Sequence, residues 1–243
     1  MTSQLIIRKW YGRLGNNIEQ LHNTILIALY YNYTICFPKH RFFNTTSIVL
    51  NKEPLIKTIS DEHDFFNRET VKNINSSLFT LNKERSLEIL QGCFVIKAAT
   101  IKPLGSNDVV IHIRSGDIFS ETPHPLYIQP PLSFYTQLLT DKKFDTIYLI
   151  AEDTKNPCID ALLKLYPHIH YSKNALEDDI RILLSGRHVI GSTGSFVSSL
   201  LKMTNNTVSL YKYDFPKDYM DIMRPWKNTD MQRSYMLSFC THI

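Results

Sequence analysis

The sequence lacks most of the compositional features that reveal a function directly. Its four cysteines are far apart and include no C-x-x-C pair, so neither a disulfide framework nor a zinc site is indicated. Lysine and arginine form no long run, which argues against a nucleic-acid-binding tail, whereas the net charge of +4 suits a small phosphorylated ligand. No D-x-D triplet stands at the end of a predicted strand, and this disfavours a metal-dependent site.

Long apolar runs are absent as well. The most apolar helical segment, residues 25–31, is too short to span a bilayer, and no apolar N-terminal region with a basic flank marks a secretory signal. The hydrophobic content of 43% and the charged content of 21% are those of a globular protein with a buried core. Because the cysteines are also expected to be reduced, these features predict a cytoplasmic protein without a membrane span.

Strand and helix patterns alternate along the chain and predict an α/β fold with parallel sheets. In the first half, residues 5–10 are predicted as a strand. A helix with helically spaced apolar residues follows, and either Asn16 or Asn17 could cap its first turn. Residues 35–37 are the next strand of this strand-helix-strand unit, and residues 40–90 are predicted to hold loops and short helices.

The second half alternates more regularly. Proline, glycine and polar residues between 100 and 108 interrupt the pattern and mark a boundary. The domains are therefore predicted as residues 1–105, residues 106–225 and a C-terminal helical segment, 226–243, that packs back across both. Helices between the later strands indicate a parallel sheet with right-handed crossovers. The predicted strands are residues 109–114, 146–150, 168–171, 188–190 and 207–211, and the predicted helices are residues 131–139, 159–166, 178–185 and 195–202.

Three turns that follow predicted strands share one chemical character, namely glycine together with small polar or cationic residues. Residues 12–17 read Gly-Arg-Leu-Gly-Asn-Asn, residues 112–117 read His-Ile-Arg-Ser-Gly-Asp, and residues 191–195 read Gly-Ser-Thr-Gly-Ser. Such turns form phosphate cradles in α/β proteins, because they bring backbone N–H groups and a fixed cation to the carboxyl edge of a sheet. Together, the three turns predict a site for an anionic nucleotide.

Arg114 is the central candidate in these turns. A strand that ends there brings its side chain to the carboxyl edge, where the planar guanidinium can bind two phosphate oxygens. The alternative is a surface salt bridge with Asp117. His112 lies deeper on the same side of the strand, where it is either part of the site or a hydrogen-bonded core residue.

Two segments near Arg114 add to the predicted site. The turn at residues 191–195 opens a helix, so unpaired backbone N–H groups and the hydroxyls of Ser192, Thr193 and Ser195 are expected to converge at the positive helix end. The proline-rich loop at residues 123–131 is either a wall or lid of the site or simply a structural loop.

Acidic residues provide further candidates. Glu152 and Asp153 end a predicted strand, and Asp178 and Asp179 begin a predicted helix. Each pair could contact a metal, a sugar hydroxyl or a base, and the helical pair could instead cap its helix. Glu19, the acid nearest to the glycine turn, is either a general base that faces a cleft or a residue that stabilises the helix dipole.

These motifs resemble the ordered motifs of the α1,2-, α1,6- and protein O-fucosyltransferase superfamily, and most of all the α1,2-fucosyltransferase-like enzymes of bacterial and viral polysaccharide synthesis. The resemblance rests on residues 12–17 with Gln20, residues 112–117 and residues 191–196. It implies a GT-B-like fold, in which two Rossmann-like domains with parallel sheets face a cleft. It also implies an inverting, metal-independent glycosyltransferase that needs no cofactor and transfers L-fucose from GDP-fucose to a glycan hydroxyl.

The resemblance assigns roles to individual residues. Arg114 matches the arginine that binds the donor pyrophosphate and stabilises the departing GDP, and His112 belongs to the same motif. Asn16, in the loop with Gly15, matches a residue near the sugar, and Asp178 or Asp179 matches an acidic contact to the nucleoside. The turn that closes on the phosphates is matched by Ser192, Thr193, Ser195 and Phe196.

Three positions depart from the family pattern. Ser115 stands where many members have a second arginine, Gly194 is inserted within the serine turn, and Glu19 stands where an aromatic residue is usual. Two alternatives therefore stay open. The donor is another GDP- or UDP-linked sugar, or the protein is a non-catalytic relative that binds a nucleotide or glycan. The acceptor base is Glu19 or Asp117, unless the acceptor hydroxyl reacts with little assistance.

Overall fold

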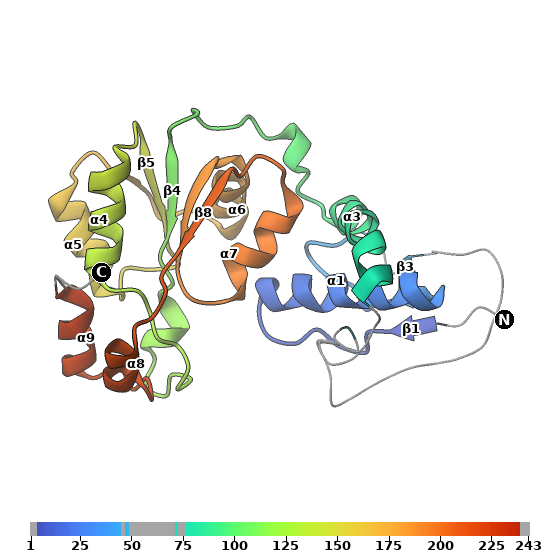
Figure 1. Ribbon diagram of the computed structural model, residues 1–243, viewed down its shortest axis with the longest axis horizontal. Helices are drawn as coiled ribbons and strands as arrows, with labels where there is room; N and C mark the ends of the chain where they lie inside the picture. The colour runs from blue at the N-terminus through green and yellow to red at the C-terminus, as the bar shows by residue number, and fades with distance from the viewer. Residues whose placement is uncertain (1–3, 45–46, 49–70, 72–75, 239–243) are drawn as a thin grey trace. The chain divides into compact units, whose positions relative to one another are not determined.

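The computed structural model describes residues 4–44, 47–48, 71 and 76–238, and the chain divides into two compact units. Unit one comprises residues 1–100 and 198–204, and unit two comprises residues 101–197 and 205–243. Each unit has its own sheet (Figure 1). None of the helices that the structure describes combines the length and the apolar character that a membrane span needs.

In its described residues, unit one has a three-stranded sheet and the long helices α1 and α3. β1 (Gln4–Ile6) and β2 (Thr34–Cys36) are parallel and are joined by α1 (Leu14–Tyr31), which confirms the predicted strand-helix-strand unit. β3 (Ser47–Ile48) pairs antiparallel with β2. α3 (Ser76–Cys93) packs against α1 and is longer than the short helices predicted for this region. The short helices η1 (Ala98–Thr100) and η3 (Leu201–Met203) complete the unit.

β1 ends earlier than the sequence predicts because side chains of α1 bind the backbone that follows it. Gln20 Nε2 donates to the carbonyl oxygen of Lys9 over 3.1 Å, and Asn17 Nδ2 donates to that of Tyr11 over 2.8 Å. These bonds satisfy backbone groups that would otherwise need a partner strand. The segment before the glycine turn is therefore a loop that the helix itself holds in place.

The start of α1 also differs from the prediction. The helix begins at Leu14, and its N-cap residue is Arg13, whose side chain makes no capping hydrogen bond. The prediction that Asn16 or Asn17 caps the helix is therefore wrong, since both residues lie inside its first turns. The helix forms because its apolar stripe is buried, with Ile18 and Leu21 fully inaccessible to solvent.

Unit two is built on a five-stranded sheet in which all neighbouring strands are parallel, and this confirms the predicted sheet. The strand order is β6-β5-β4-β7-β8, so the first strand of the unit lies at the centre. The strands are β4 (Val109–His112), β5 (Ile147–Ile150), β6 (His170–Tyr171), β7 (His188–Gly191) and β8 (Ser209–Lys212).

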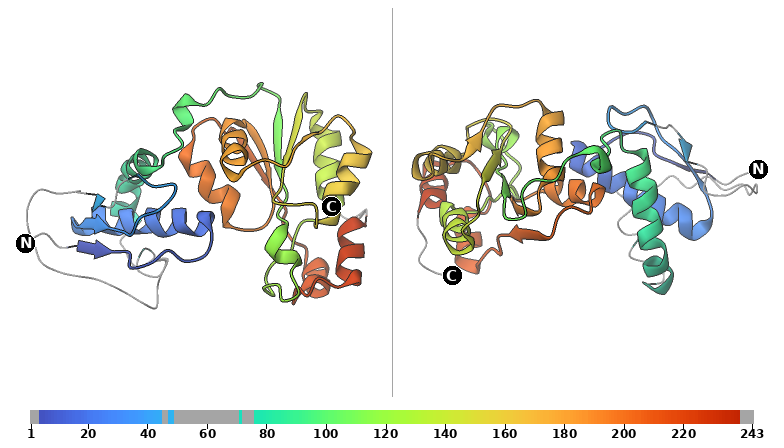
Figure 2. Two further views of the ribbon diagram at one scale, coloured as in Figure 1. Left: turned by 180° about the vertical axis from the view of Figure 1, so that it is seen from behind. Right: turned by 90° about the horizontal axis from the view of Figure 1, so that it is seen from above.

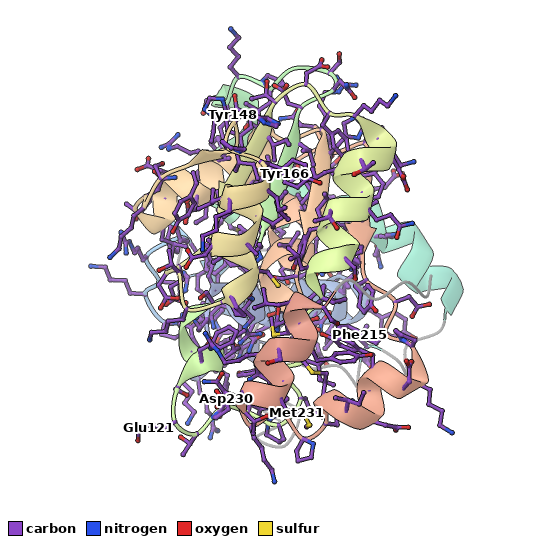
Figure 3. The ribbon with its side chains drawn as sticks, turned by 90° about the vertical axis from the view of Figure 1, so that its left-hand side faces the viewer. Glu121, Tyr148, Tyr166, Phe215, Asp230 and Met231 are labelled. Atoms are coloured by element: carbon purple, nitrogen blue, oxygen red, sulfur yellow. The ribbon has the colours of Figure 1, made fainter. Side chains whose placement is uncertain are left out.

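Helices cover both faces of this sheet. α4 (Leu132–Lys142) and α5 (Pro157–Leu165) lie on one face, and α6 (Leu176–Ser185) and α7 (Ser195–Leu200) lie on the other (Figures 1 and 2). Figure 3 looks onto the first face, where the hydroxyl of Tyr166, just after α5, donates to the carbonyl oxygen of Thr136 in α4 over 3.4 Å. Right-handed crossovers between parallel strands produce this arrangement.

The C-terminal segment of unit two closes the core on the side of α4 and α5. α8 (Lys217–Met223) and α9 (Asp230–Leu237) follow β8, and α9 packs against α4 and α5. Trp226, between them, is 1% exposed, and its indole N–H donates to the carbonyl oxygen of Ile118 over 2.8 Å. Its backbone N–H donates to Pro125 O over 2.9 Å. The C-terminal segment thus supports the loops that follow β4.

Candidate functional site

The candidate site lies where the chain reverses its direction of travel across the sheet of unit two. From β4 the chain adds β5 and β6 on one side, and it then returns to add β7 and β8 on the other. His112, the last residue of β4, pairs with Gly191, the last residue of β7. The turns that follow these two strands therefore start at the same level of the carboxyl edge, where open α/β sheets bind their ligands.

Arg114 extends from the turn after β4, and contacts of different kinds restrain its side chain. Its Nη2 lies 3.3 Å from Asp117 Oδ2, so the salt bridge expected as an alternative is present. Its guanidinium carbon lies 4.0 Å from the ring centroid of Tyr127, which comes from the proline-rich loop. With only 20% of the side chain exposed, the cation is held in place and partly shielded from water.

Gly194 brings the turn after β7 against this guanidinium. A Cβ atom added at Gly194 would lie 2.7 Å from Arg114 Nη1, and the residue has a φ of +131°, which side chains disfavour. The structure therefore places the guanidinium beside Gly194, in the turn that the sequence predicts to belong to the same site. Gly194, a departure from the family pattern, is the residue that leaves room for it.

Ser192 links the two turns through its hydroxyl group. The Oγ atom accepts the backbone N–H of Arg114 over 3.0 Å and lies 2.8 Å from His112 Nδ1. Which of these two groups donates the proton depends on the tautomer of the imidazole. The imidazole ring also packs on Phe196, with ring centroids 5.0 Å apart. The structure thus brings together four of the predicted residues, Arg114, His112, Ser192 and Phe196.

Thr193 and Ser195 lie in the same turn. Both residues are half-buried, and Ser195 is the first residue of α7, as the predicted helix start requires. In the described part of the chain, no group of three or more His, Cys, Asp or Glu side chains is arranged to hold a metal ion.

Asp153 and Asn156 fix the turn that carries Arg114. Asp153 Oδ1 accepts the Ser115 hydroxyl and also the Gly116 backbone N–H over 3.1 Å. Burial acts to raise the pKa of Asp153, but the hydrogen bonds from Ser115, Lys155 and Gly116 and the Lys155 charge lower it below its usual value. Asn156 caps α5, and its Nδ2 donates to the carbonyl oxygen of Arg114 over 2.9 Å.

Sequence reasoning missed Asn156, although a signal was present. An asparagine followed by proline marks a helix start, because the amide oxygen caps the helix and proline suits its first position. That signal predicts the cap, which Asn156 provides to the Cys158 N–H over 3.0 Å. It does not predict the contact with Arg114, which depends on how the strands lie beside each other.

The other predicted acidic residues lie around the site in different ways. Glu152 is exposed, and its carboxylate occupies the space that a side chain at Gly116, which has a φ of +66°, would need. Asp178 and Asp179 lie in the first turn of α6, but the N-cap is Ala175, so the alternative that this pair caps the helix is wrong. Burial raises the pKa of Asp179 and the Asp178 charge adds to this, while a hydrogen bond from Asn174 opposes it.

The predicted residues of unit one form a separate group at the start of α1. Gly15 is buried, Asn16 is half-buried, and the Asn16 side chain packs against Gly12, which has a φ of +69°. Glu19, half-buried one turn further along, interacts electrostatically with Lys202 and acts to raise the pKa of that lysine, against the larger lowering effect of burial.

A five-stranded parallel sheet, with helices on both faces and polar turns at its switch point, defines the doubly wound class of α/β proteins, which bind their ligands at that point. Within that class the chain has the fold of fucosyltransferase-like structures. It is similar to POFUT1 in complex with GDP, with a TM-score of 0.50 and 8% sequence identity over 88% of this chain and 99% of that chain.

Two other solved structures are similar to a lesser degree. POFUT1 in complex with GDP-fucose has a TM-score of 0.49 and 11% identity, over 88% of this chain and 99% of that chain. Fucosyltransferase NodZ from Bradyrhizobium has a TM-score of 0.41 and 11% identity, over 84% of this chain and 94% of that chain. These neighbours are glycosyltransferases. No protein-family model and no curated protein matches the sequence.

Proposed function

We propose that the chain is an inverting, metal-independent glycosyltransferase that transfers L-fucose from GDP-fucose to a hydroxyl group of a glycan acceptor. Its likeness in fold to POFUT1 in complex with GDP supports GDP as the nucleotide. In this proposal the two units are the Rossmann-like domains of a GT-B enzyme, and unit two binds the donor. The proposed activity would serve polysaccharide biosynthesis.

The position of Arg114 carries this proposal. Its guanidinium lies beside Gly194 at the switch point of a parallel sheet, where a diphosphate would meet it. When the bond between the anomeric carbon and the β-phosphate oxygen breaks, both electrons stay with the phosphate, and the sugar gains oxocarbenium character. A fixed cation stabilises this separation of charge more in the transition state than in the ground state.

The remaining site residues take supporting roles in this proposal. The hydroxyls and backbone N–H groups of Ser192, Thr193 and Ser195 bind phosphate oxygens, next to His112 and Phe196. Acidic residues of unit two contact the nucleoside or sugar hydroxyls, and residues of the glycine loop lie near the sugar. The acidic residues are Glu152, Asp178 and Asp179, and the glycine-loop residues are Gly15 and Asn16.

The acceptor oxygen attacks the face of the anomeric carbon opposite the leaving phosphate, and its proton passes to a base or to water. Glu19 and Asp117 are the candidate bases. Asp117 is ion-paired with Arg114, so its protonation would remove a negative charge beside the guanidinium at the moment when GDP departs.

A nucleotide panel tests the proposal. A ligand that binds only the folded state raises the melting temperature, so GDP and GDP-fucose are expected to stabilise the protein more than UDP or UDP-sugars. Labelled GDP-fucose is expected to be transferred or slowly hydrolysed. A larger shift with UDP would assign another donor, and a shift with GDP but no turnover would define a binding protein. No shift with any nucleotide would refute the proposal.

A further inference from the structure

Both backbone polar groups of Arg114 are bound by side chains and not by a neighbouring strand. The N–H of Arg114 donates to Ser192 Oγ over 3.0 Å, and its carbonyl oxygen accepts from Asn156 Nδ2 over 2.9 Å. The last ladder-like bond on this side is made one residue earlier, from Ile113 N to Ile150 O over 3.1 Å. The direction in which Arg114 leaves the sheet is therefore set by side chains.

The side chain of Asp153 accepts several hydrogen bonds from the turn that follows β4. Its Oδ1 atom accepts the hydroxyl of Ser115, the N–H of Gly116 over 3.1 Å and the N–H of Lys155 over 3.0 Å. Its Oδ2 atom lies 3.5 Å from Lys155 Nζ. The carboxylate is thus occupied by the two residues that follow Arg114 and by its own loop.

Ser115 joins the Asp153 contacts to the Asn156 contacts. It is 1% exposed, as is Asn156, and its Oγ accepts the backbone N–H of Asn156 over 3.0 Å while it donates to Asp153. A buried hydroxyl that loses its acceptor keeps the cost of desolvation without compensation, so the turn is expected to rearrange when the carboxylate is removed.

We propose that Asp153 is a positioning residue, which holds the backbone turn at residues 114–116 and thereby keeps the Arg114 guanidinium beside Gly194. The inference rests on the proposed function, because it concerns the cation that binds the donor phosphates. It changes the role of Asp153, since the carboxylate acts on protein groups through Ser115 and Gly116 and not on the nucleotide.

Three variants test this role. Asp153→Ala removes the acceptor, Asp153→Asn keeps an amide oxygen that can still accept from Ser115 and Gly116, and Asp141→Ala is the control. Asp141 is an exposed acid in α4 of the same unit. For each variant, amide hydrogen exchange is measured at Gly116 in the free protein. GDP affinity is then measured by calorimetry, and kcat and KM are measured for hydrolysis of GDP-fucose.

The Asp153→Ala variant is expected to show faster exchange at Gly116. Its kcat should fall on the order of 10- to 100-fold, with a smaller change in KM, because a displacement of about 1 Å at a catalytic group has effects of this size. Asp153→Asn should recover kcat to within about threefold of wild type, since a neutral acceptor replaces most of the lost hydrogen bonds. Asp141→Ala should match wild type throughout.

The results distinguish this inference from the function on which it rests. If the wild-type protein binds no GDP, the proposed function fails and the inference fails with it. If wild type binds GDP and Asp153→Ala matches it in affinity and kcat although Gly116 exchanges faster, only the positioning role is overturned. An Asp153→Asn variant as impaired as Asp153→Ala would also overturn it, because charge would then matter more than the acceptor.

Discussion

Arg114 combines a restrained side chain with a restrained backbone. The Tyr127 ring lies under its guanidinium, Asp117 pairs with Nη2, and Ser192 and Asn156 bind its backbone. Such restraint lowers the reorganisation needed when charge develops on a ligand, which is how preorganised cations stabilise a transition state. Substitution of Arg114 is therefore expected to change the rate of sugar transfer more than the free energy of unfolding.

Replacement of Arg114 by glutamine removes the charge from the site. We expect kcat for GDP-fucose turnover to fall on the order of 100- to 1000-fold, as for the loss of one oxyanion-hole donor. Arg187→Gln is the matched control, because Arg187 is exposed and precedes β7 at the opposite edge of the sheet. Steady-state kinetics check this, and near-normal turnover of the Arg114→Gln variant would reject the assigned role.

Gly194→Ala tests the close approach of the two turns. The new methyl group would lie 2.7 Å from Arg114 Nη1 at a φ of +131°, so the guanidinium or the turn must move. We expect a stability loss of about 1–2 kcal/mol and weaker binding of GDP. In contrast, Gly92→Ala in α3 should stabilise the protein by about 0.5–1 kcal/mol, because the added Cβ would meet no heavy atom within 4 Å apart from its chain neighbours and the backbone of its own helix. Urea denaturation measures the two changes in stability, and calorimetry measures GDP affinity. An unchanged GDP affinity in Gly194→Ala would contradict the close approach of the two turns.

The residues at strand ends were predictable from sequence, but their partners were not. Arg114, His112 and Ser192 follow apolar strand patterns, and parallel strands bring their carboxyl ends to one edge of a sheet. Asn156 follows β5, and its contact with Arg114 depends on the register between β4 and β5, which no local pattern encodes.

Among whole helices and strands, too, some were predictable from the sequence and others were not. The strands of unit two and its helices α4 to α7 were predicted to within a few residues, because fully buried strands and amphipathic helices have distinct apolar periods. α8 was not predicted from the sequence. The start of α1 was not predicted correctly. Asn17 provides no cap, because its amide donates to the Tyr11 carbonyl oxygen in the preceding loop. Polar side chains serve caps and loops equally well, and only tertiary structure selects between them.

Trp226 tests how the C-terminal segment supports the site loops. Trp226→Phe deletes the N–H that donates to Ile118 O and leaves a small cavity, so we expect a loss of about 1–3 kcal/mol in the free energy of unfolding. Met231→Ala is the control, because Met231 in α9 is 63% exposed and its truncation should change stability by less than about 0.5 kcal/mol. Equal stability of the two variants in urea would show that the indole contact contributes nothing.

At the scale of the whole molecule, the stability of unit one depends on a segment from late in the chain. Residues 198–204 belong to this unit, and Lys202 Nζ donates to His22 Nδ1 over 3.0 Å. His22 Nε2 then donates to the buried Ser86 hydroxyl over 3.1 Å. Burial first, and then the charges of Lys202 and Lys83, lower the pKa of His22 to about 3.

Stability should therefore depend on pH through His22. The folded protein keeps the imidazole neutral, whereas the unfolded chain binds a proton near pH 6.5. The contribution of His22 is complete above that pH and is lost as the pH falls toward about 3, at up to about 1.4 kcal/mol per pH unit. Urea denaturation at pH 7 and at about pH 5 should show a smaller decrease for His22→Gln than for wild type. An identical decrease in the two proteins would contradict the assignment.

The most direct measurement is a crystal structure of the protein with GDP. The proposed function predicts that the β-phosphate lies within hydrogen-bond distance of the Arg114 guanidinium and of groups in residues 192–195, at the carboxyl edge between β4 and β7. GDP bound elsewhere on the chain, or a crevice between these two turns that is filled by side chains and excludes it, would contradict the account.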